Sequence, residues 1–423
     1  MNKRLFILIF VVLAVGAVVT GALYAQERGN VSTLETELAD SKAETLAMEA
    51  DLVATETQVS TLKAQISTLE AQVSALETEV SALETTLGEA VFPLTFPDAN
   101  LEVAIRKAID RPEGSIYIFD LESLTQLNAL GVGIISNLTG LEYCLNLQAL
   151  HLADNNISDI SALAGLNNLQ WLDLRNNNIS DISALTGLIN LQWLDFYANN
   201  ISDISALVDL NELQVLHLAV NNISDISAMA ELTNLNRLYL WGNNISDISA
   251  LAGLNNLEVL VLMSNNISDI SALADLTNLW RLALTDNNIS DISALTELTD
   301  LWRLALTNNN ISDISALAGL SNLQDIDLDN NNISDISALA GLTNLLWLTM
   351  TDNNISDISA LAGLNILQEL DLTNNNISDI SALADNEWFT DGDFVGLSGN
   401  PLSEESINIY IPQLEERGAI VYY

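Results

Sequence analysis

The sequence has a single cysteine, Cys144, which excludes a framework of internal disulfide bonds. Stability outside a cell would therefore have to come from packing, and we expect Cys144 to be an inert core thiol. Basic residues are also scarce, with 13 Lys and Arg against 56 Asp and Glu. The resulting formal charge of -43 would repel a phosphate backbone, so we expect no nucleic-acid partner.

Aromatic residues are few as well, at 5% of the chain, although 49% of its residues are apolar. This composition argues against a disordered acidic tail and leaves Leu and Ile to form a long core. The sequence patterns of a nucleophile elbow, a phosphate loop and a Cys/His cluster are absent too. We therefore expect no enzyme, no catalytic residues and no cofactor.

Residues 5–23 are almost entirely apolar and follow Lys3 and Arg4. This pattern fits both a cleaved signal peptide and a signal anchor held by the positive-inside rule. As a helix the segment would span roughly 28 Å, about the hydrocarbon thickness, so its length favours the anchor. We predict a single-pass protein of the cell membrane, anchored through residues 1–30, with the rest of the chain extracytoplasmic. The alternative is a secreted protein cleaved after Ala22 or Ala25.

A heptad pattern continues unbroken from Val31 to Leu87, without Pro or Gly. A period of 3.5 residues sustained over this length indicates a coiled coil, here a stalk of roughly 85 Å formed by residues 31–88. In the second half of the segment, β-branched residues at a and Leu at d favour a parallel homodimer, whereas Glu79 would face Glu84 and repel it, which leaves a trimer open. The alternative is a lone amphipathic helix with its apolar stripe in water. The a positions are Val31, Leu38, Thr45, Leu52, Val59, Ile66, Val73, Val80 and Leu87, and the d positions are Leu34, Ser41, Met48, Thr55, Leu62, Leu69, Leu76 and Leu83.

Beyond Phe92 the tripeptide Asn-Ile-Ser recurs every 22 residues without a slip. One unit, residues 169–188, reads LQWLDLRNNNISDISALTGL. Leu172 and Leu174 alternate with Asp173, the period of a short strand with one buried face, and successive units would stack these strands into a parallel sheet about 4.8 Å apart. Asn177 and its equivalents would form a buried amide ladder that satisfies backbone groups. The Ile of the tripeptide stands at positions 157, 179, 201, 223, 245, 267, 289, 311, 333, 355 and 377.

This unit resembles the repeat of bacterial leucine-rich-repeat proteins, in the internalin-like subtype of 22 residues with the core pattern L-x-x-L-x-L-x-x-N-x-I. The resemblance covers the chain from about Phe92 to its end. It implies an α/β solenoid, a leucine-rich-repeat horseshoe with a parallel concave sheet and a short 3-10 or irregular convex side. It also implies that the concave face binds another macromolecule and, more specifically, that the protein takes part in adhesion.

The ends of such a solenoid need caps, because an open end would expose Leu and Ile. Residues 96–109 predict an amphipathic helix with Asp98 as its N-cap, and residues 403–417 predict a closing helix. The segment from Trp388 to Leu402 breaks the repeat pattern. We therefore divide the chain into an anchor (1–30), a coiled-coil stalk (31–88), an N-terminal cap with a degenerate first repeat (92–146), regular repeats (147–385) and a C-terminal cap (386–423).

Only positions that vary between repeats can distinguish one part of the surface from another, and most of these lie in the strands. All four Arg of the regular repeats and both His of the chain stand there. Trp, Tyr and Arg are the residues that most often supply binding hot spots. We predict that an extracellular protein or glycan binds a concave site formed by Trp171, Trp193, Tyr197, His217, Arg237, Tyr239, Trp241, Arg281 and Arg303.

Two alternatives to a binding site stay open. Exposed aromatic side chains can stack on cross-strand neighbours and stiffen the sheet, and positions free of packing constraint vary first after a recent duplication. In either case the chain would be a structural surface-layer or spacer protein without a specific ligand. Exposed, mobile aromatic side chains would favour recognition, whereas rings packed flat against one another would favour structure.

A column of carboxylates begins with Asp159, Asp181 and Asp203 and continues through eight further repeats. We expect each Asp to cap the turn after it, a contribution of about 1 kcal/mol that offsets a repulsion of roughly 0.8 kcal/mol between neighbours. A ladder of divalent cations is the alternative. His151 and His217 would lie roughly 14 Å apart along the sheet, too far to share one metal ion, so we predict no metal site.

Overall fold

A computed structural model describes residues 12–22, 31–87, 93–384 and 392–423. The chain divides into two compact units, Met1–Val91 and Phe92–Tyr423. The first unit contains a helix at residues 12–22 and the 57-residue helix α2 (Val31–Leu87), which covers the segment predicted to form a coiled coil. The heptad residues in the second half of α2 are exposed, namely Val59, Leu62, Ile66, Leu69, Val73 and Leu76.

The predicted single-pass membrane location is wrong. Among the described residues, no helix is both long and apolar enough to cross a membrane. Residues 1–11 and 23–30 of the predicted anchor lie outside the described residues.

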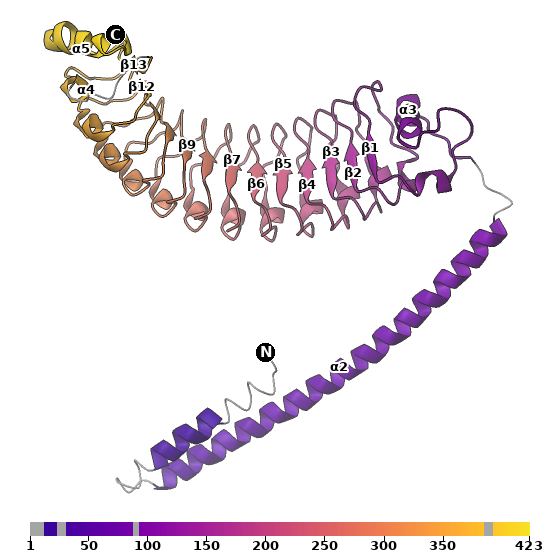
Figure 1. Cartoon of the computed structure of the whole chain (residues 1–423). Helices are drawn as coiled ribbons and strands as arrows, with labels where there is room; N and C mark the ends of the chain where they lie inside the picture. The colour runs from indigo at the N-terminus through magenta and orange to yellow at the C-terminus, as the bar shows by residue number, and fades with distance from the viewer. Residues whose placement is uncertain (1–11, 23–30, 88–92, 385–391) are drawn as a thin grey trace. The chain divides into compact units, whose positions relative to one another are not determined.

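The second unit is a solenoid whose strands form one parallel sheet of 14 strands in chain order. Figure 1 shows the strands along the inner side of a curve, with the short helical turns on the outer side. Every strand from β2 to β12 pairs in register with the equivalent residues one repeat away, as Trp171 does with Trp193. The strands are β1 (Gln126–Asn128), β2 (Ala149–His151), β3 (Trp171–Asp173), β4 (Trp193–Asp195), β5 (Val215–His217), β6 (Arg237–Tyr239), β7 (Val259–Val261), β8 (Arg281–Ala283), β9 (Arg303–Ala305), β10 (Asp325–Asp327), β11 (Trp347–Thr349), β12 (Glu369–Asp371), β13 (Phe394–Gly396) and β14 (Ile420–Tyr422).

The core is aliphatic, as the composition predicts. Leu172, Leu174, Ile179, Leu185 and their equivalents are fully buried and form one continuous cluster along the solenoid. After each strand from β1 to β11 the chain makes a short 3-10 turn on the convex side, as expected for so brief a segment. These turns are η2 (Leu141–Tyr143), η3 (Ser161–Leu163), η4 (Ser183–Leu185), η5 (Ser205–Leu207), η6 (Ser227–Met229), η7 (Ser249–Leu251), η8 (Ser271–Leu273), η9 (Ser293–Leu295), η10 (Ser315–Leu317), η11 (Ser337–Gly341) and η12 (Ser359–Gly363).

The predicted asparagine ladder is present, and it links neighbouring repeats. The Nδ2 of Asn177 donates to the carbonyl of Leu174 in its own repeat and to that of Leu152 in the preceding repeat, both at 3.0 Å. Its Oδ1 accepts from the backbone N–H of Ile157 at 2.9 Å. These groups are buried, so each amide satisfies backbone atoms that water cannot reach.

One residue of each regular repeat has a left-handed backbone at the position before the ladder asparagine. Asn or Asp occupies it in most repeats, for example Asn176 with φ 54°, and Gly242 with φ 69° occupies it in another. Val220 adopts φ 55° there. Since a β-branched side chain strains this conformation, Val220 is a local weak point of the solenoid.

Both caps are formed largely as predicted. Helix α3 (Ala99–Ala108) starts at Asp98, whose Oδ1 accepts from the backbone N–H groups of Asn100 and Leu101. At the other end, α4 (Ser381–Ala384) is followed by a π-helical turn η13 (Ser406–Tyr410) and helix α5 (Ile411–Glu416). The sequence did not predict that β13 and β14 extend the sheet. Residues 385–391, including Trp388, lie outside the described residues. A short 3-10 turn, η1 (Ile118–Leu121), precedes β1.

Cys144 is fully buried beside the degenerate first repeat. Burial, with the nearby charge of Glu142, raises the pKa of its thiol to about 12. The thiol is therefore protonated at neutral pH, and the prediction that Cys144 lies in the core is confirmed.

Candidate functional site

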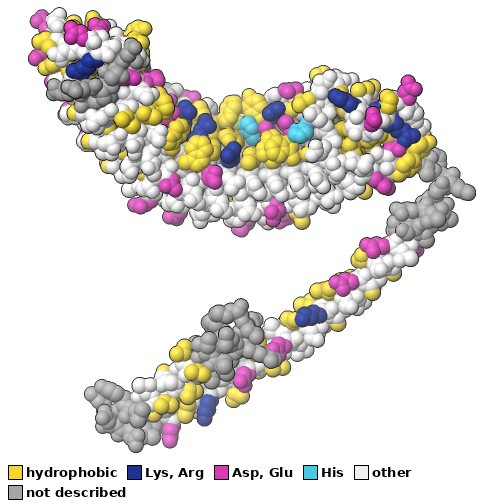
Figure 2. Space-filling view, viewed as in Figure 1, with side chains coloured by type: hydrophobic (Ala, Val, Ile, Leu, Met, Phe, Trp, Pro, Cys, Tyr) yellow, Lys and Arg dark blue, Asp and Glu magenta, His cyan; other side chains and the backbone are white. Residues whose placement is uncertain are grey.

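The concave face is formed by the first and third residues of each short strand, while the middle residue points into the core. In β5, for example, Leu216 is buried between the half-buried Val215 and His217. Because neighbouring strands lie about 4.8 Å apart and in register, equivalent side chains of adjacent repeats stand side by side. Figure 2 shows apolar, arginine and histidine side chains together across these strands.

Trp171 and Trp193 pack flat on each other, with ring centroids 3.9 Å apart and an interplanar angle of 4°. Trp171 is 39% exposed, and its other neighbour, His151, lies 6.2 Å away. Flat packing of this kind matches a structural role for these two residues, in which cross-strand rings stiffen the sheet.

A second aromatic group surrounds His217 and is arranged differently. The ring of Tyr197 lies 5.4 Å from that of His217 and 5.5 Å from that of Trp241, and the ring of Tyr239 lies 5.0 Å from His217. Interplanar angles of 27° to 52° show that these rings are tilted or offset. The structure thus divides the predicted aromatic residues into a flat tryptophan pair and an uneven group, Tyr197, His217, Tyr239 and Trp241, which we call the aromatic group.

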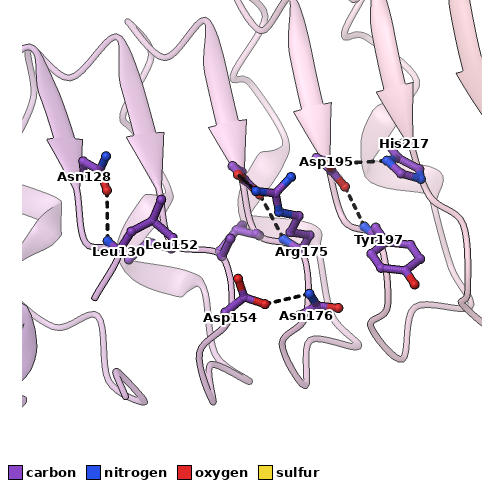
Figure 3. A network of polar contacts seen from close by, with 12 residues as sticks. Asn128, Leu130, Leu152, Asp154, Arg175, Asn176, Asp195, Tyr197 and His217 are labelled. Carbon is purple, nitrogen blue, oxygen red and sulfur yellow. Dashed lines mark hydrogen bonds and ion pairs between the residues drawn. The ribbon is translucent and has the colours of Figure 1, made fainter. Parts of the chain in front are cut away.

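Two buried carboxylates, Asp173 and Asp195, lie beside this group in the same column of the sheet. Asp195 is 3% exposed; it accepts from the backbone N–H of Tyr197 at 2.8 Å and lies 3.3 Å from Nδ1 of His217 (Figure 3). The Nε2 of His217 is buried without a hydrogen-bond partner among the described residues. Asp173, one strand away, pairs with Arg175 at 3.7 Å. Burial raises the pKa of Asp173, while the backbone N–H and the charge of Arg175 act in the opposite direction.

A small apolar cluster lies on the concave face at its centre, apart from the main core. Val259, Val261 and Ala283 are buried in it. Tyr239, Trp241, Met263 and Ala305 pack against it and remain partly exposed. The sequence did not predict this cluster, although its signal was visible as Val and Ala in columns that elsewhere hold polar residues.

The arginines of the concave face differ in their pairing. Nε of Arg303 lies 3.1 Å from Oδ2 of Asp325. Arg237 and Arg281 have no ion pair among the described residues, and Nε of Arg281 is buried without an acceptor there. Burial raises the pKa of Asp325, and the charge of Arg303 opposes this shift.

The later strands carry an acidic stretch that was not predicted from the sequence either. Asp327 accepts from the hydroxyl groups of Thr307 and Thr349, and Asp329 accepts from the backbone N–H of Thr351 at 2.6 Å. Burial raises the pKa of Asp329. The sequence signal for this stretch was the alternation of Asp325, Asp327 and Asp329 in and just after β10.

The convex Asp column forms the predicted local contacts. Oδ1 of Asp181 accepts from the backbone N–H of Ser183 at 2.8 Å, and this contact recurs from Asp159 to Asp379. The same hydrogen bond lowers the pKa of Asp181. Capping is therefore confirmed as a role of the column. Among the described residues, no group of three or more His, Cys, Asp or Glu side chains is placed to hold a metal ion.

Comparison with known proteins identifies the repeat. The family described as "Leucine Rich repeats (2 copies)" matches residues 145–187, 189–231, 211–253, 233–275 and 303–341, and "Leucine Rich repeat" matches residues 364–384. No match was found among curated proteins. The repeats and the parallel solenoid define the chain as a leucine-rich-repeat protein.

Comparison with solved structures identifies the family within the leucine-rich-repeat class. An internalin, InlF, from Listeria monocytogenes is 35% identical over 78% of this chain and 98% of its own, with a TM-score of 0.72. The chain therefore belongs to the internalin-like family of bacterial leucine-rich-repeat proteins, as its 22-residue unit predicted. A leucine-rich-repeat protein of Leptospira interrogans is 26% identical over 67% of this chain and 74% of its own, with a TM-score of 0.61.

A plant example shares the fold alone. The ectodomain of the Arabidopsis thaliana receptor kinase GASSHO1/SCHENGEN3 was solved in complex with Casparian strip integrity factor 2. It is 24% identical over 66% of this chain and 36% of its own, with a TM-score of 0.56.

Proposed function

We propose that this protein binds another protein through the concave face of its solenoid and has no catalytic activity. The site consists of the nine predicted residues, centred on the aromatic group together with Arg237 and Arg281. The observation that carries the proposal is that aromatic and unpaired cationic side chains gather on one face of a chain with a formal charge of -43. Interface hot spots are enriched in these residue types.

The flat tryptophan pair and the aromatic group support different roles. Trp171 and Trp193 already use their ring faces on each other, which suits stiffening of the sheet. Tyr197, Tyr239 and Trp241 are tilted and half-buried, so ring area remains for a partner. We therefore assign the main binding contribution to the aromatic group and a supporting one to the tryptophan pair.

A protein partner fits this surface better than a glycan. The partly exposed Met263 and Ala305 are aliphatic and lie over an apolar cluster, which suits an apolar side chain. The plant receptor ectodomain with the same fold was solved in complex with Casparian strip integrity factor 2. An extracellular protein is thus the proposed partner, and adhesion is the specific form of recognition that the internalin-like family favours.

The test compares two matched tryptophan variants of the full chain, Trp241→Ala and Trp193→Ala. Surface proteins and polysaccharides of neighbouring cells are offered to the immobilised protein, and both partner affinity and thermal stability are measured for each variant. Trp241→Ala should weaken binding by about 2 kcal/mol or more. Trp193→Ala should mainly reduce stability, by about 1 kcal/mol, because it breaks a stacked pair.

A different result would favour another function. If both variants capture the same partners with unchanged affinity, the concave site is wrong. If the wild-type chain captures nothing above background, a structural role as a surface-layer or spacer protein is favoured instead.

We also propose that α2 self-associates as a parallel coiled coil and carries the solenoid as a stalk. The heptad side chains of its second half are apolar and exposed in the single chain, and a helix with such a stripe is stabilised by a second copy. Several solenoids on one stalk would bind a multivalent partner with avidity. Residues 31–88, 92–146, 147–385 and 386–423 are the proposed stalk, N-terminal cap, repeats and C-terminal cap.

Sedimentation of the full chain and of a variant with Leu62, Leu69 and Leu76 changed to Glu tests this proposal. The full chain should be a dimer or trimer and the variant a monomer. A monomeric full chain at every practical concentration would exclude both the stalk and binding with avidity.

A further inference from the structure

Two arginines lie at the centre of the concave face, on strands whose relative positions are set by the sheet. Arg237 on β6 and Arg281 on β8 are register partners of the same residue, Val259 on β7. Two strand spacings separate them, roughly 10 Å. Val259 itself is 2% exposed, so the space between the two arginines is floored by apolar atoms and not by a carboxylate.

The pairing of the other concave arginines shows how unusual these two are. Arg175 and Arg303 each contact an Asp of the same or the next strand. Arg237 and Arg281 form no ion pair among the described residues, in a chain with more than four acidic residues for each basic one, although the charge of Arg281 acts on the pKa of Asp325 together with that of Arg303. Arg281 is also half-buried, with its Nε out of reach of solvent. A partly desolvated guanidinium binds a carboxylate more strongly than a fully hydrated one, because less water has to be removed on binding.

Apolar surface adjoins the two charges. Tyr239, Trp241 and Met263 pack on the apolar cluster and keep part of their area exposed. These side chains pack against the buried Val259, Val261 and Ala283, so they lose little freedom when a partner arrives. Apolar contact and cationic contact are therefore offered within the same three strands.

We propose that this surface, whose role as a binding site rests on the proposed function, recognises a protein segment with two carboxylates flanking an apolar side chain. Arg237 and Arg281 each take one carboxylate, and the apolar side chain lies over Tyr239, Trp241 and Met263. The net charge of -43 has little effect on an acidic segment once it is bound, since charges beyond about 8 Å are largely screened at physiological ionic strength. Arg237 and Arg281 therefore determine the preference for an acidic segment.

The experiment is a selection of random twelve-residue peptides displayed on phage against the immobilised full chain, followed by affinity measurements on synthetic copies of the selected peptides. Peptides with Asp or Glu on both sides of Leu, Ile, Met or Phe should be enriched. Their affinity should fall about tenfold or more in Arg237→Gln and in Arg281→Gln, because each change removes a charge-assisted hydrogen bond. Arg175→Gln is the matched control; its guanidinium lies 3.7 Å from Asp173 and outside the proposed binding site, so affinity should change less than about threefold. Replacing the peptide carboxylates by amides should reproduce the loss in the wild-type chain.

Three outcomes would overturn the inference, and they differ in what else they refute. Selected peptides that need Trp241 but lack acidic residues, or that keep their affinity in both Gln variants, refute the inference and leave the proposed function standing. Selected peptides that ignore both Trp241 and the arginines refute the two together. Polygalacturonate that binds with the same dependence on Arg237 and displaces the peptides would show that carboxylates suffice without the apolar side chain. Because Arg237 is exposed, its Gln variant should fold normally, which keeps the test decisive.

Discussion

The asparagine ladder predicts a specific pattern of coupling between mutations. Each ladder amide donates to a carbonyl of its own repeat and to one of the preceding repeat, so adjacent amides share an acceptor. The carbonyl of Leu218 accepts from Asn221 at 3.0 Å and from Asn243 at 3.0 Å. The carbonyl of Phe196 is shared in the same way by Asn199 and Asn221.

The size of the effect follows from the groups left without a partner. Asn221→Ala removes the acceptor of the Ile201 N–H, which is buried, while the carbonyls of Leu218 and Phe196 each keep one donor. One orphaned donor costs about 1–3 kcal/mol, and the loss of the remaining contacts adds to it, so we expect about 3 kcal/mol for the single change. Combining Asn221→Ala with Asn243→Ala also leaves the Leu218 carbonyl without either side-chain donor. That pair should be more destabilising than the sum of its parts by about 1–2 kcal/mol.

The matched control is the pair Asn199→Ala and Asn243→Ala, which share no acceptor. In that double variant Asn221 still donates to both Phe196 and Leu218, so the two effects should add. Urea unfolding followed by circular dichroism gives all the free energies, with the slopes compared to confirm one cooperative transition. Additive behaviour of the adjacent pair, or equal coupling in both pairs, would show that shared carbonyls do not link the repeats energetically.

Three further predictions concern the turns and the charges. Val220→Asn should raise the free energy of unfolding by about 1 kcal/mol, because Asn tolerates the left-handed backbone that strains Val. Asn308→Val, at the equivalent position of a later repeat, should lower the free energy of unfolding. A neutral result for both variants would contradict the assigned strain. The carboxylate of Asp181 has a lowered pKa in the folded chain, so its contribution to stability is present above its unfolded pKa of about 3.9 and is lost as pH falls through the lower folded value. The stability difference between the wild type and Asp181→Asn should accordingly shrink as the pH falls below the unfolded pKa, and a difference that grows on acidification would mean that the folded chain raises this pKa. Calcium should change the melting temperature little more than sodium does at equal ionic strength, since each Asp of the convex column already accepts a hydrogen bond. A much larger rise with calcium would favour a ladder of divalent cations along this column.

Most of the solenoid could be predicted because its determinants repeat. Leu, Ile and Asn at a 22-residue spacing specify the strand, the turn and the ladder eleven times over, so a single ambiguous residue such as Met229 changes nothing. The caps were predictable from helix signals such as the N-cap Asp98, whereas the strand pairing of Phe394 with Ile420 was not. Those residues follow no period, and only three-dimensional packing brings them together.

The candidate site was predictable in position but not in detail. The columns of the sheet follow from the register, which placed Trp171 beside Trp193 and Arg237 beside Val259. Which ring stacks flat, and which arginine finds an Asp, depends on side-chain rotamers that the columns leave open. The pairing of Arg303 with Asp325, and its absence at Arg281, is therefore information that only the structure supplies.

Because similar units stack in register, the number of repeats between two strands sets the distance between their side chains. Unequal recombination between repeats of one gene adds or removes whole units of 22 residues without disturbing the ladder or the core. Loss of the unit that contains β7 would bring the guanidinium-bearing strands β6 and β8 next to each other, halving their separation to about 5 Å. Gain of a unit at the same place would widen it to about 15 Å. A lineage carrying this gene can thus change the spacing of the charges it recognises in fixed steps, with no substitution at Arg237 or Arg281.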